Sequence, residues 1–189
     1  MTMKPSWPGW RLALGSLLCA CLPVATSAWA AEGGCAIVFG HGRNLSDDDT
    51  RANTAWNEVN RAFNAVVASE LGAAGLRVVA MVAPVEVTDL AAIIATVTSR
   101  AVREGCATVV ETTIFADEAE HLLVVRLRAY PLLRGATSAP PAPRIGEPTY
   151  SDQQQYQLTQ RTLDRLAPAT LGRQMAAGYL GQGVGQAAH

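Results

Sequence analysis

The chain has 189 residues, of which 49% are hydrophobic and 16% are charged, and its formal net charge is −1 at pH 7. The arginines are scattered among acidic residues and form no basic cluster, which excludes a typical nucleic-acid-binding surface. Lys4 is the only lysine, so the rest of the chain has neither a lysine nucleophile nor a phosphate-loop lysine.

Residues 1–30 have the pattern of a signal peptide. Positive charges precede an apolar run at 12–22, and a small-x-small cleavage site follows at Ala28 to Ala30. The run is shorter than the about 20 apolar residues that cross a bilayer as a helix. We therefore expect export, cleavage after Ala30 and a periplasmic protein.

A second processing outcome competes with this one. Leu18 to Cys21 (LCAC) resembles the bacterial lipobox, whose last cysteine receives a lipid after cleavage. Cys19 occupies a position where a small or branched residue is usual, so cleavage after Ala30 is preferred. In the alternative, the protein is an outer-membrane lipoprotein attached through Cys21, which would be its only contact with a membrane.

The first half of the processed chain predicts a β-α-β-α-β unit. Short β-branched runs at 36–39, 77–82 and 107–115 indicate strands. Between them, apolar residues at three- and four-residue spacing predict helices capped by Ser46 and Thr88. Such connections pair strands in parallel through right-handed crossovers.

An antiparallel hairpin is expected next. An acidic corner at 117–120 leads to a strand at 121–133, in which apolar and polar residues alternate. The carboxylates of this corner are interpreted as solvated, and His121 as a half-exposed edge residue. Residues 135–149 contain four prolines among small residues and predict a mobile loop or a hairpin tip.

The remaining segments complete the predicted domain. Residues 153–159 are compatible with a strand or a helix, and the alternation of Tyr156 and Leu158 favours a final antiparallel strand. The apolar spacing after this segment predicts one or two helices, broken or kinked at Pro168. Residues 181–189 predict a flexible tail. The expected fold class is α/β (α+β), in one domain over 31–180: a βαβαββ sheet with two helices on one face, a proline-rich loop and a C-terminal helix or helices.

Cys35 and Cys106 are the cysteines that follow the leader. An even pair in an oxidising compartment is a disulfide candidate. Each precedes an apolar β-rich run, so in neighbouring parallel strands both sulfur atoms would lie at the same edge of the sheet. The disulfide is preferred over two buried thiols, and no zinc site is expected because no histidine lies nearby.

The loop after the first strand is a candidate ligand site. Residues 40–45 (GHGRNL) open like a dinucleotide fingerprint, but Leu45 replaces its third glycine and three aspartates follow. If the first strand lies between the second and third, this loop sits where open α/β sheets receive ligands, here a peptide or an anion. The alternative is a turn whose glycines supply unusual dihedral angles. The candidate contacts are His41, Arg43 and Asn44.

Other polar residues have simpler interpretations. Arg126 and Arg128 share a face of the fourth predicted strand and either dock an acidic partner or keep that face hydrated. Glu111 lies inside the apolar third strand and is interpreted as solvent-facing, in preference to a buried acid. No G-x-S-x-G or H-E-x-x-H motif occurs, so we expect no enzyme, no cofactor and no metal.

The order of elements resembles a known group. Arg103 to Thr112 (REGCATVVET) stands where members of this group have a glycine, a strand and a long hairpin. The chain is similar in this pattern to the TolB amino-terminal domain, the activator LpoB and the curli-secretion lipoprotein. The pattern covers about 35–180 and implies non-enzymatic work in the envelope. We therefore expect an exported accessory or interaction module with an envelope protein partner or self-association. The alternative is a small-ligand or anion-binding protein, or a minor hydrolase, that uses the His41–Arg43 loop.

Overall fold

A computed structural model describes residues 34–42, 50–133 and 143–182. The expected signal peptide with Cys21, the candidate contacts Arg43 and Asn44, and the segments 134–142 and 183–189 lie outside these ranges. In the described part of the chain, no helix is long and apolar enough to cross a membrane.

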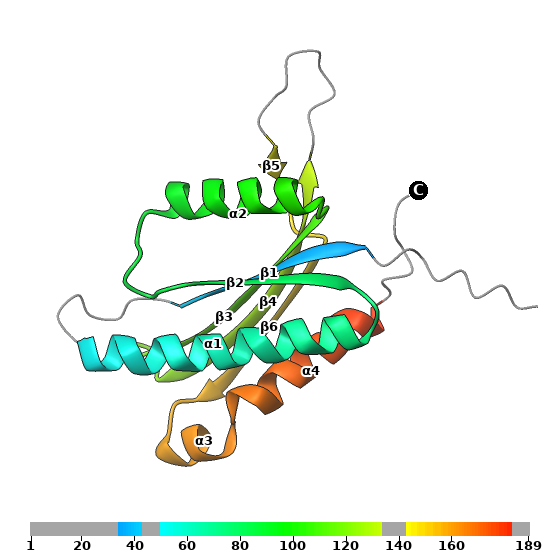
Figure 1. The fold of residues 1–189 in the computed structure, drawn as a ribbon. Coiled ribbons are helices and arrows are strands. Elements are labelled where there is room, and N and C mark those ends of the chain that lie inside the picture. Colours follow the sequence, from blue (N-terminus) through cyan, green and yellow to red (C-terminus); the bar gives the residue numbers. More distant parts are fainter. Residues whose placement is uncertain (1–33, 43–49, 134–142, 183–189) are drawn as a thin grey trace, which may run out of the picture. The chain divides into compact units, whose positions relative to one another are not determined.

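The elements follow the predicted order (Figure 1). They are β1 (Cys35–His41), α1 (Thr50–Ala73), β2 (Arg77–Ala83), α2 (Leu90–Glu104), β3 (Thr108–Asp117), β4 (Leu122–Leu133), β5 (Arg144–Ile145), β6 (Tyr150–Gln157), α3 (Gln160–Arg165) and α4 (Pro168–Gly181).

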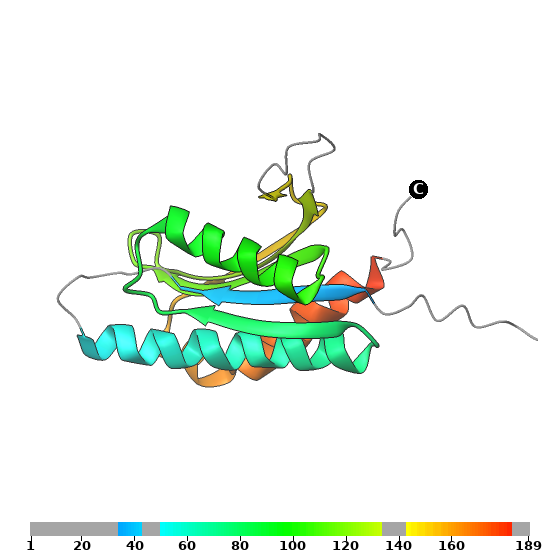
Figure 2. The ribbon, with the colours of Figure 1, turned by 45° about the horizontal axis from the view of Figure 1, so that its top comes forward.

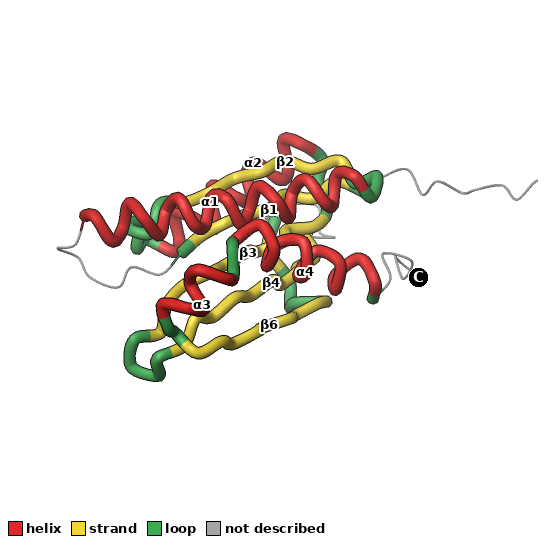
Figure 3. The backbone as a smooth tube through the Cα atoms, turned by 90° about the horizontal axis from the view of Figure 1, so that it is seen from below, coloured by secondary structure: helices red, strands yellow, loops and turns green. Residues whose placement is uncertain are grey.

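The strands form one mixed sheet. β1 lies between β2 and β3 and is parallel to both, and β4 continues the sheet antiparallel to β3. The outer edge of β4 pairs with β6 and, at Leu132 and Leu133, with the short β5. Figure 3 shows the resulting order of β2, β1, β3, β4 and β6. The α/β class and the antiparallel hairpin are therefore confirmed, and part of the proline-rich segment pairs as β5.

Helices cover both faces of this sheet (Figure 2). α1 and α4 bury Phe63 and Met175 against one face, whereas α2 buries Val97 against Ile37 and Phe39 on the other. The prediction that the two crossover helices share one face is wrong, because α1 and α2 lie on opposite faces and the C-terminal helix α4 lies beside α1. The chain leaves β1 in one direction to form β2 and returns past it to form β3, so right-handed crossovers place α1 and α2 on opposite faces.

Buried asparagines of α1 pair with the sheet where β1 ends. β1 pairs with β3 as far as Thr112. Beyond that point, the Asn60 side chain donates to the Ile114 carbonyl at 3.0 Å and accepts from the Ile114 N–H at 3.1 Å. Asn64 donates to the Val38 carbonyl at 3.2 Å. Asn60 thereby satisfies backbone groups of Ile114 that a neighbouring strand would otherwise pair.

Gly40 and Gly42 permit this close approach. A Cβ atom at Gly42 would lie 2.3 Å from Val85 Cγ1 and 2.7 Å from Asn60 Nδ2, and one at Gly40 would lie 2.9 Å from Asn64 Cβ. Neither glycine has a positive φ. The interpretation that they supply unusual dihedral angles is therefore wrong, because the need for glycine is steric.

A disulfide joins Cys35 and Cys106 as predicted. It connects the start of β1 to the residues just before β3, and Cys106 is fully buried. The disulfide therefore fixes the two central parallel strands at the end opposite His41.

The helix ends refine two predictions. Asp89, and not Thr88, caps α2, because its side chain accepts from the Ala92 N–H at 3.0 Å. Pro168 is the first residue of α4 and separates it from α3, so the C-terminal segment forms two helices. A proline at this position is well tolerated because its missing N–H has no partner within the helix.

Candidate functional site

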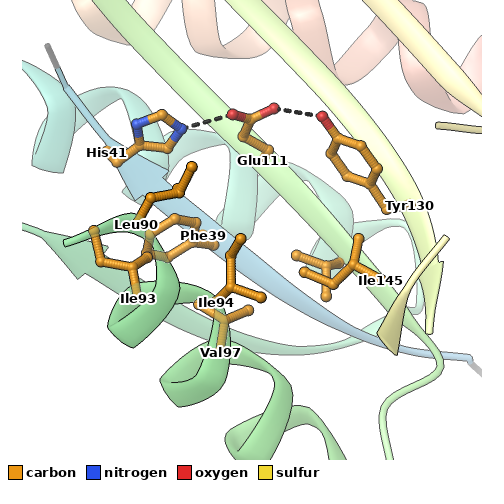
Figure 4. A pocket seen from close by; sticks show the side chains of 10 residues that line it. Phe39, His41, Leu90, Ile93, Ile94, Val97, Glu111, Tyr130 and Ile145 are labelled. Atoms are coloured by element: carbon orange, nitrogen blue, oxygen red, sulfur yellow. Dashed lines mark hydrogen bonds and ion pairs between the residues drawn. The ribbon is translucent and has the colours of Figure 1, made fainter. Parts of the chain in front are cut away.

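Three neighbouring strands bring polar side chains together on the face that α2 covers (Figure 4). His41 ends β1, Glu111 lies in β3 and Tyr130 in β4. His41 Nε2 donates to Glu111 Oε1 at 2.6 Å, and the Tyr130 hydroxyl donates to Glu111 Oε2 at 2.9 Å. Arg126 Nη2 lies 3.4 Å from Glu111 Oε1. One carboxylate is therefore held by three donors from two neighbouring strands.

These contacts keep the carboxylate ionised. The Glu111 side chain is only 15% exposed, and this burial raises its pKa, but the hydrogen bond from His41 and the charge of Arg126 outweigh burial and lower the pKa from 4.5 to about 2. Burial and the nearby carboxylate together raise the pKa of Tyr130. The interpretation of Glu111 as a solvent-facing residue is therefore wrong. It is a largely buried acid with specific partners.

An apolar pocket of about 240 Å³ lies beside this polar row. In Figure 4 the side chains of α2 lie on one side of the pocket and the row of His41, Glu111 and Tyr130 lies on the other. Leu90 and Ile94 are 64% and 42% exposed. They therefore form an apolar rim that solvent can reach. The apolar lining consists of Phe39, Leu90, Ile93, Ile94, Val97, Val109 and Ile145.

The polar row does not form a hydrolytic relay. In such a relay the carboxylate and the nucleophile contact different nitrogens of one histidine. Here Nε2 of His41 faces both Glu111 and the Thr113 hydroxyl, at 2.6 and 3.2 Å, and Nδ1 lies 3.3 Å from the Gly42 carbonyl oxygen. Thr113 is also buried. This geometry favours a structural and binding role for the row.

Among residues 34–42, 50–133 and 143–182, no three His, Cys, Asp or Glu side chains lie close enough together to hold a metal ion. The pocket is also smaller than the 300–1,000 Å³ that is typical of cofactor and drug-sized ligand sites.

The sequence-predicted residues divide into three groups. His41 lines the pocket, and β1 lies between β2 and β3, which was the condition for a site at this edge. Arg126 and Arg128 lie on β4 beside the polar row, on the face of the pocket. The turn residue His121 is exposed, with φ of 54°, and lies far along the hairpin from the pocket.

Sequence reasoning missed Tyr130 and the α2 wall, and it misjudged Glu111. One signal was present, because residues 109, 111 and 113 and residues 126, 128 and 130 share a face by the two-residue period of a strand. The register that brings these two sets together was not visible in the sequence.

No protein-family model matches the sequence, and no curated protein matches it. Among solved structures, a PelC variant dodecamer from Paraburkholderia phytofirmans is similar at 14% identity and a TM-score of 0.38, over 79% of this chain and 86% of that one. A second PelC dodecamer from this organism has 11% identity and a TM-score of 0.35, over 79% and 84%. Lipoprotein GNA1162 from Neisseria meningitidis has 12% identity and a TM-score of 0.37, over 82% and 99%. The similarity concerns the arrangement of strands and helices, and the resemblance to TolB, LpoB and the curli-secretion lipoprotein stays a prediction.

Proposed function

We propose that this chain is an exported, non-catalytic docking module of the bacterial envelope. Its docking site is the pocket between α2 and the face formed by β1, β3 and β4, which receives an apolar side chain of a partner protein. The observation that carries this proposal is an apolar pocket whose rim, Leu90 and Ile94, is exposed to solvent. Exposed apolar surface that borders a cavity is typical of interaction sites.

The volume of the pocket favours a side chain as its occupant. About 240 Å³ is below the usual range for drug-sized ligands, but it accommodates one large aliphatic or aromatic side chain. Burial of such an anchor contributes roughly 2 kcal/mol. Protein interfaces commonly concentrate their binding energy in a few anchors of this kind.

The disulfide supports the proposed compartment. Bonds such as Cys35–Cys106 form in oxidising surroundings, and reducing conditions in the cytosol disfavour them. Together with the predicted leader, this favours the periplasm. A lipid on Cys21 is the alternative form of the same module at the outer membrane, and mass spectrometry of the mature N-terminus distinguishes the two.

A second candidate function is the binding of a small polar ligand. It is favoured by the convergence of His41, Glu111 and Tyr130 at one wall of the pocket. These groups make hydrogen bonds to one another, however, and the rest of the lining is apolar. A free polar ligand would therefore lose hydration without full replacement, which favours an apolar guest.

Site-specific cross-linking tests the docking function. A photoreactive amino acid replaces Ile94 in one variant and Val102 in another, because both residues lie on α2 and are 42% and 44% exposed, but only Ile94 lines the pocket. Cells expressing each variant are irradiated, and cross-linked proteins are identified by mass spectrometry. We expect one dominant partner at position 94 and much less of it at position 102.

The cross-linking result also separates the alternatives. A cross-link to a second copy of the chain at position 94 identifies self-association. Equal yields at the two positions, or no protein cross-link at position 94, would contradict the proposal. Tight binding or turnover of a small molecule by the purified protein would then favour the second candidate function.

A further inference from the structure

We infer that the partner segment carries an acidic residue beside its apolar anchor, and that Arg126 and Arg128 bind this carboxylate. The inference rests on the proposed docking function and adds the charge of the partner. It combines the apolar pocket with two cationic side chains that lie next to it on the same face of the sheet.

The strand register places the two arginines. Arg128 lies opposite Glu111 in the β3–β4 pairing, and Arg126 lies opposite Thr113. Side chains at directly paired positions project from the same face of a sheet. Both arginines therefore lie on the face of the pocket, with Arg128 two residues and Arg126 four residues before Tyr130 in β4.

The face beyond the pocket offers a path for an extended segment. α2 packs over β1, with Val97 against Ile37 and Phe39. On the other side of the arginines, Ser151 and Gln153 of β6 pair with Arg128 and Arg126 and are exposed. A chain that inserts an apolar side chain beside α2 can therefore continue across β4 toward β6.

The two guanidinium groups have donors available for an anion. A guanidinium carries five N–H donors, and its planar shape matches a carboxylate. Arg126 makes one long contact with Glu111, at 3.4 Å, and its buried Nε has no hydrogen-bond acceptor among the described residues. The Arg128 side chain lies close enough to the Tyr130 hydroxyl to lower its pKa.

The charge beside the pocket is positive. Arg126 and Arg128 contribute two positive charges, against the one negative charge of Glu111, which already accepts three donors. The Arg126 side chain is only 21% exposed, so it is not simply a hydrated surface residue. Such a patch attracts a carboxylate and repels a cation, which gives selectivity among apolar segments.

The test uses synthetic peptides and the purified mature protein with its disulfide intact. The reference peptide is acetyl-Gly-Ser-Asp-Leu-Asp-Gly-Ser-amide, and three others replace both Asp by Asn, both Asp by Lys, or Leu by Ala. Binding is measured by amide chemical-shift titration, which detects millimolar affinities. The protein variants are Arg128→Met, Arg126→Met and the control Arg173→Met, which changes an exposed arginine of α4 on the other face.

We expect the Asp peptide to shift amides around the pocket and to bind about tenfold more weakly to Arg128→Met and Arg126→Met, which corresponds to about 1.4 kcal/mol. Arg173→Met should bind like the wild type. The Asn peptide should bind about tenfold more weakly than the Asp peptide and be insensitive to the arginines, and the Lys peptide should not bind. If Arg126→Met fails to fold, Arg128→Met decides.

Two results would overturn the inference. One is equal affinity for the Asp and Asn peptides with no effect of Arg128→Met. If the Ala peptide still loses binding in that case, the docking function stands and only the acidic preference is refuted. The other is occupation of the pocket by dodecanoate with no binding of the Asp peptide, which would identify a free amphiphile as the ligand. Failure of the docking function itself is seen separately, in the cross-linking at position 94.

Discussion

Replacing Glu111 by Gln should remove a pH-dependent contribution to the free energy of unfolding, so that the difference between the two proteins measures this contribution. The pKa of this carboxyl falls from 4.5 to about 2 in the folded protein. At about 1.4 kcal/mol per pH unit, this difference amounts to about 3 kcal/mol. Glutamine has nearly the same shape, so the loss of charge is the main change.

The sign of the effect follows from the direction of the pKa shift. Because the folded pKa lies below the unfolded one, the Glu111 carboxylate stabilises the fold fully above about pH 5, and this contribution is lost as the pH falls toward 2. Wild type should therefore exceed Glu111→Gln by about 3 kcal/mol at pH 7. The difference should approach zero near pH 2.

Urea unfolding followed by Trp56 fluorescence measures the free energy of unfolding of both proteins across this pH range. Trp56 belongs to α1 and packs against the core, so its fluorescence reports on global unfolding. The matched control is Glu118→Gln, an exposed carboxylate in the turn between β3 and β4, for which the change should stay within about 0.5 kcal/mol. A difference between wild type and Glu111→Gln that is constant from pH 2 to pH 7 would refute the argument.

Three further predictions concern the scaffold of the site. Gly42→Ala should destabilise the protein by about 2 kcal/mol, because the new Cβ would lie 2.3 and 2.7 Å from neighbouring atoms. Gly72→Ala, whose Cβ meets nothing within 4 Å, should stabilise α1 by about 0.5 kcal/mol. Equal melting temperatures of these two variants would contradict this prediction. Asn60→Asp should cost about 3 kcal/mol at pH 7 in urea unfolding, because one carboxylate oxygen replaces the amide donor to a β3 carbonyl, and an unchanged midpoint would argue against that pairing. Joint replacement of Cys35 and Cys106 by Ser should lower the free energy of unfolding by about 4 kcal/mol, given their separation of 71 residues. Unfolding of the wild-type protein that does not change when reductant is added would rule this out.

The local signals in the sequence predicted the elements well. Alternation in β4 and the apolar spacing of α1 depend only on neighbouring residues, and both gave the correct element type. The cysteine pair was also predictable, because each cysteine directly precedes a strand of the parallel core. These predictions needed no knowledge of which strand pairs with which.

The candidate site depended on pairing and was only partly predictable. Glu111 looked like a solvent-facing residue because its partners His41, Arg126 and Tyr130 are 70, 15 and 19 residues away in the sequence. Only the order β2-β1-β3-β4 and its register bring them together. The same order decides that α2 lies opposite α1 and forms the wall of the pocket.

The position of β1 has a consequence for how this chain reaches its native state. β1 is the first of the described strands to be synthesised, yet both of its neighbours, β2 and β3, come later, and Thr112 must appear before its second edge is complete. Contacts between segments that are distant in the sequence slow folding and prolong the exposure of unpaired strand edges, which promote aggregation. Oxidation of Cys35 must also wait for Cys106 to emerge. Until Cys106 is available, the edges of β1 stay open to pairing with other chains.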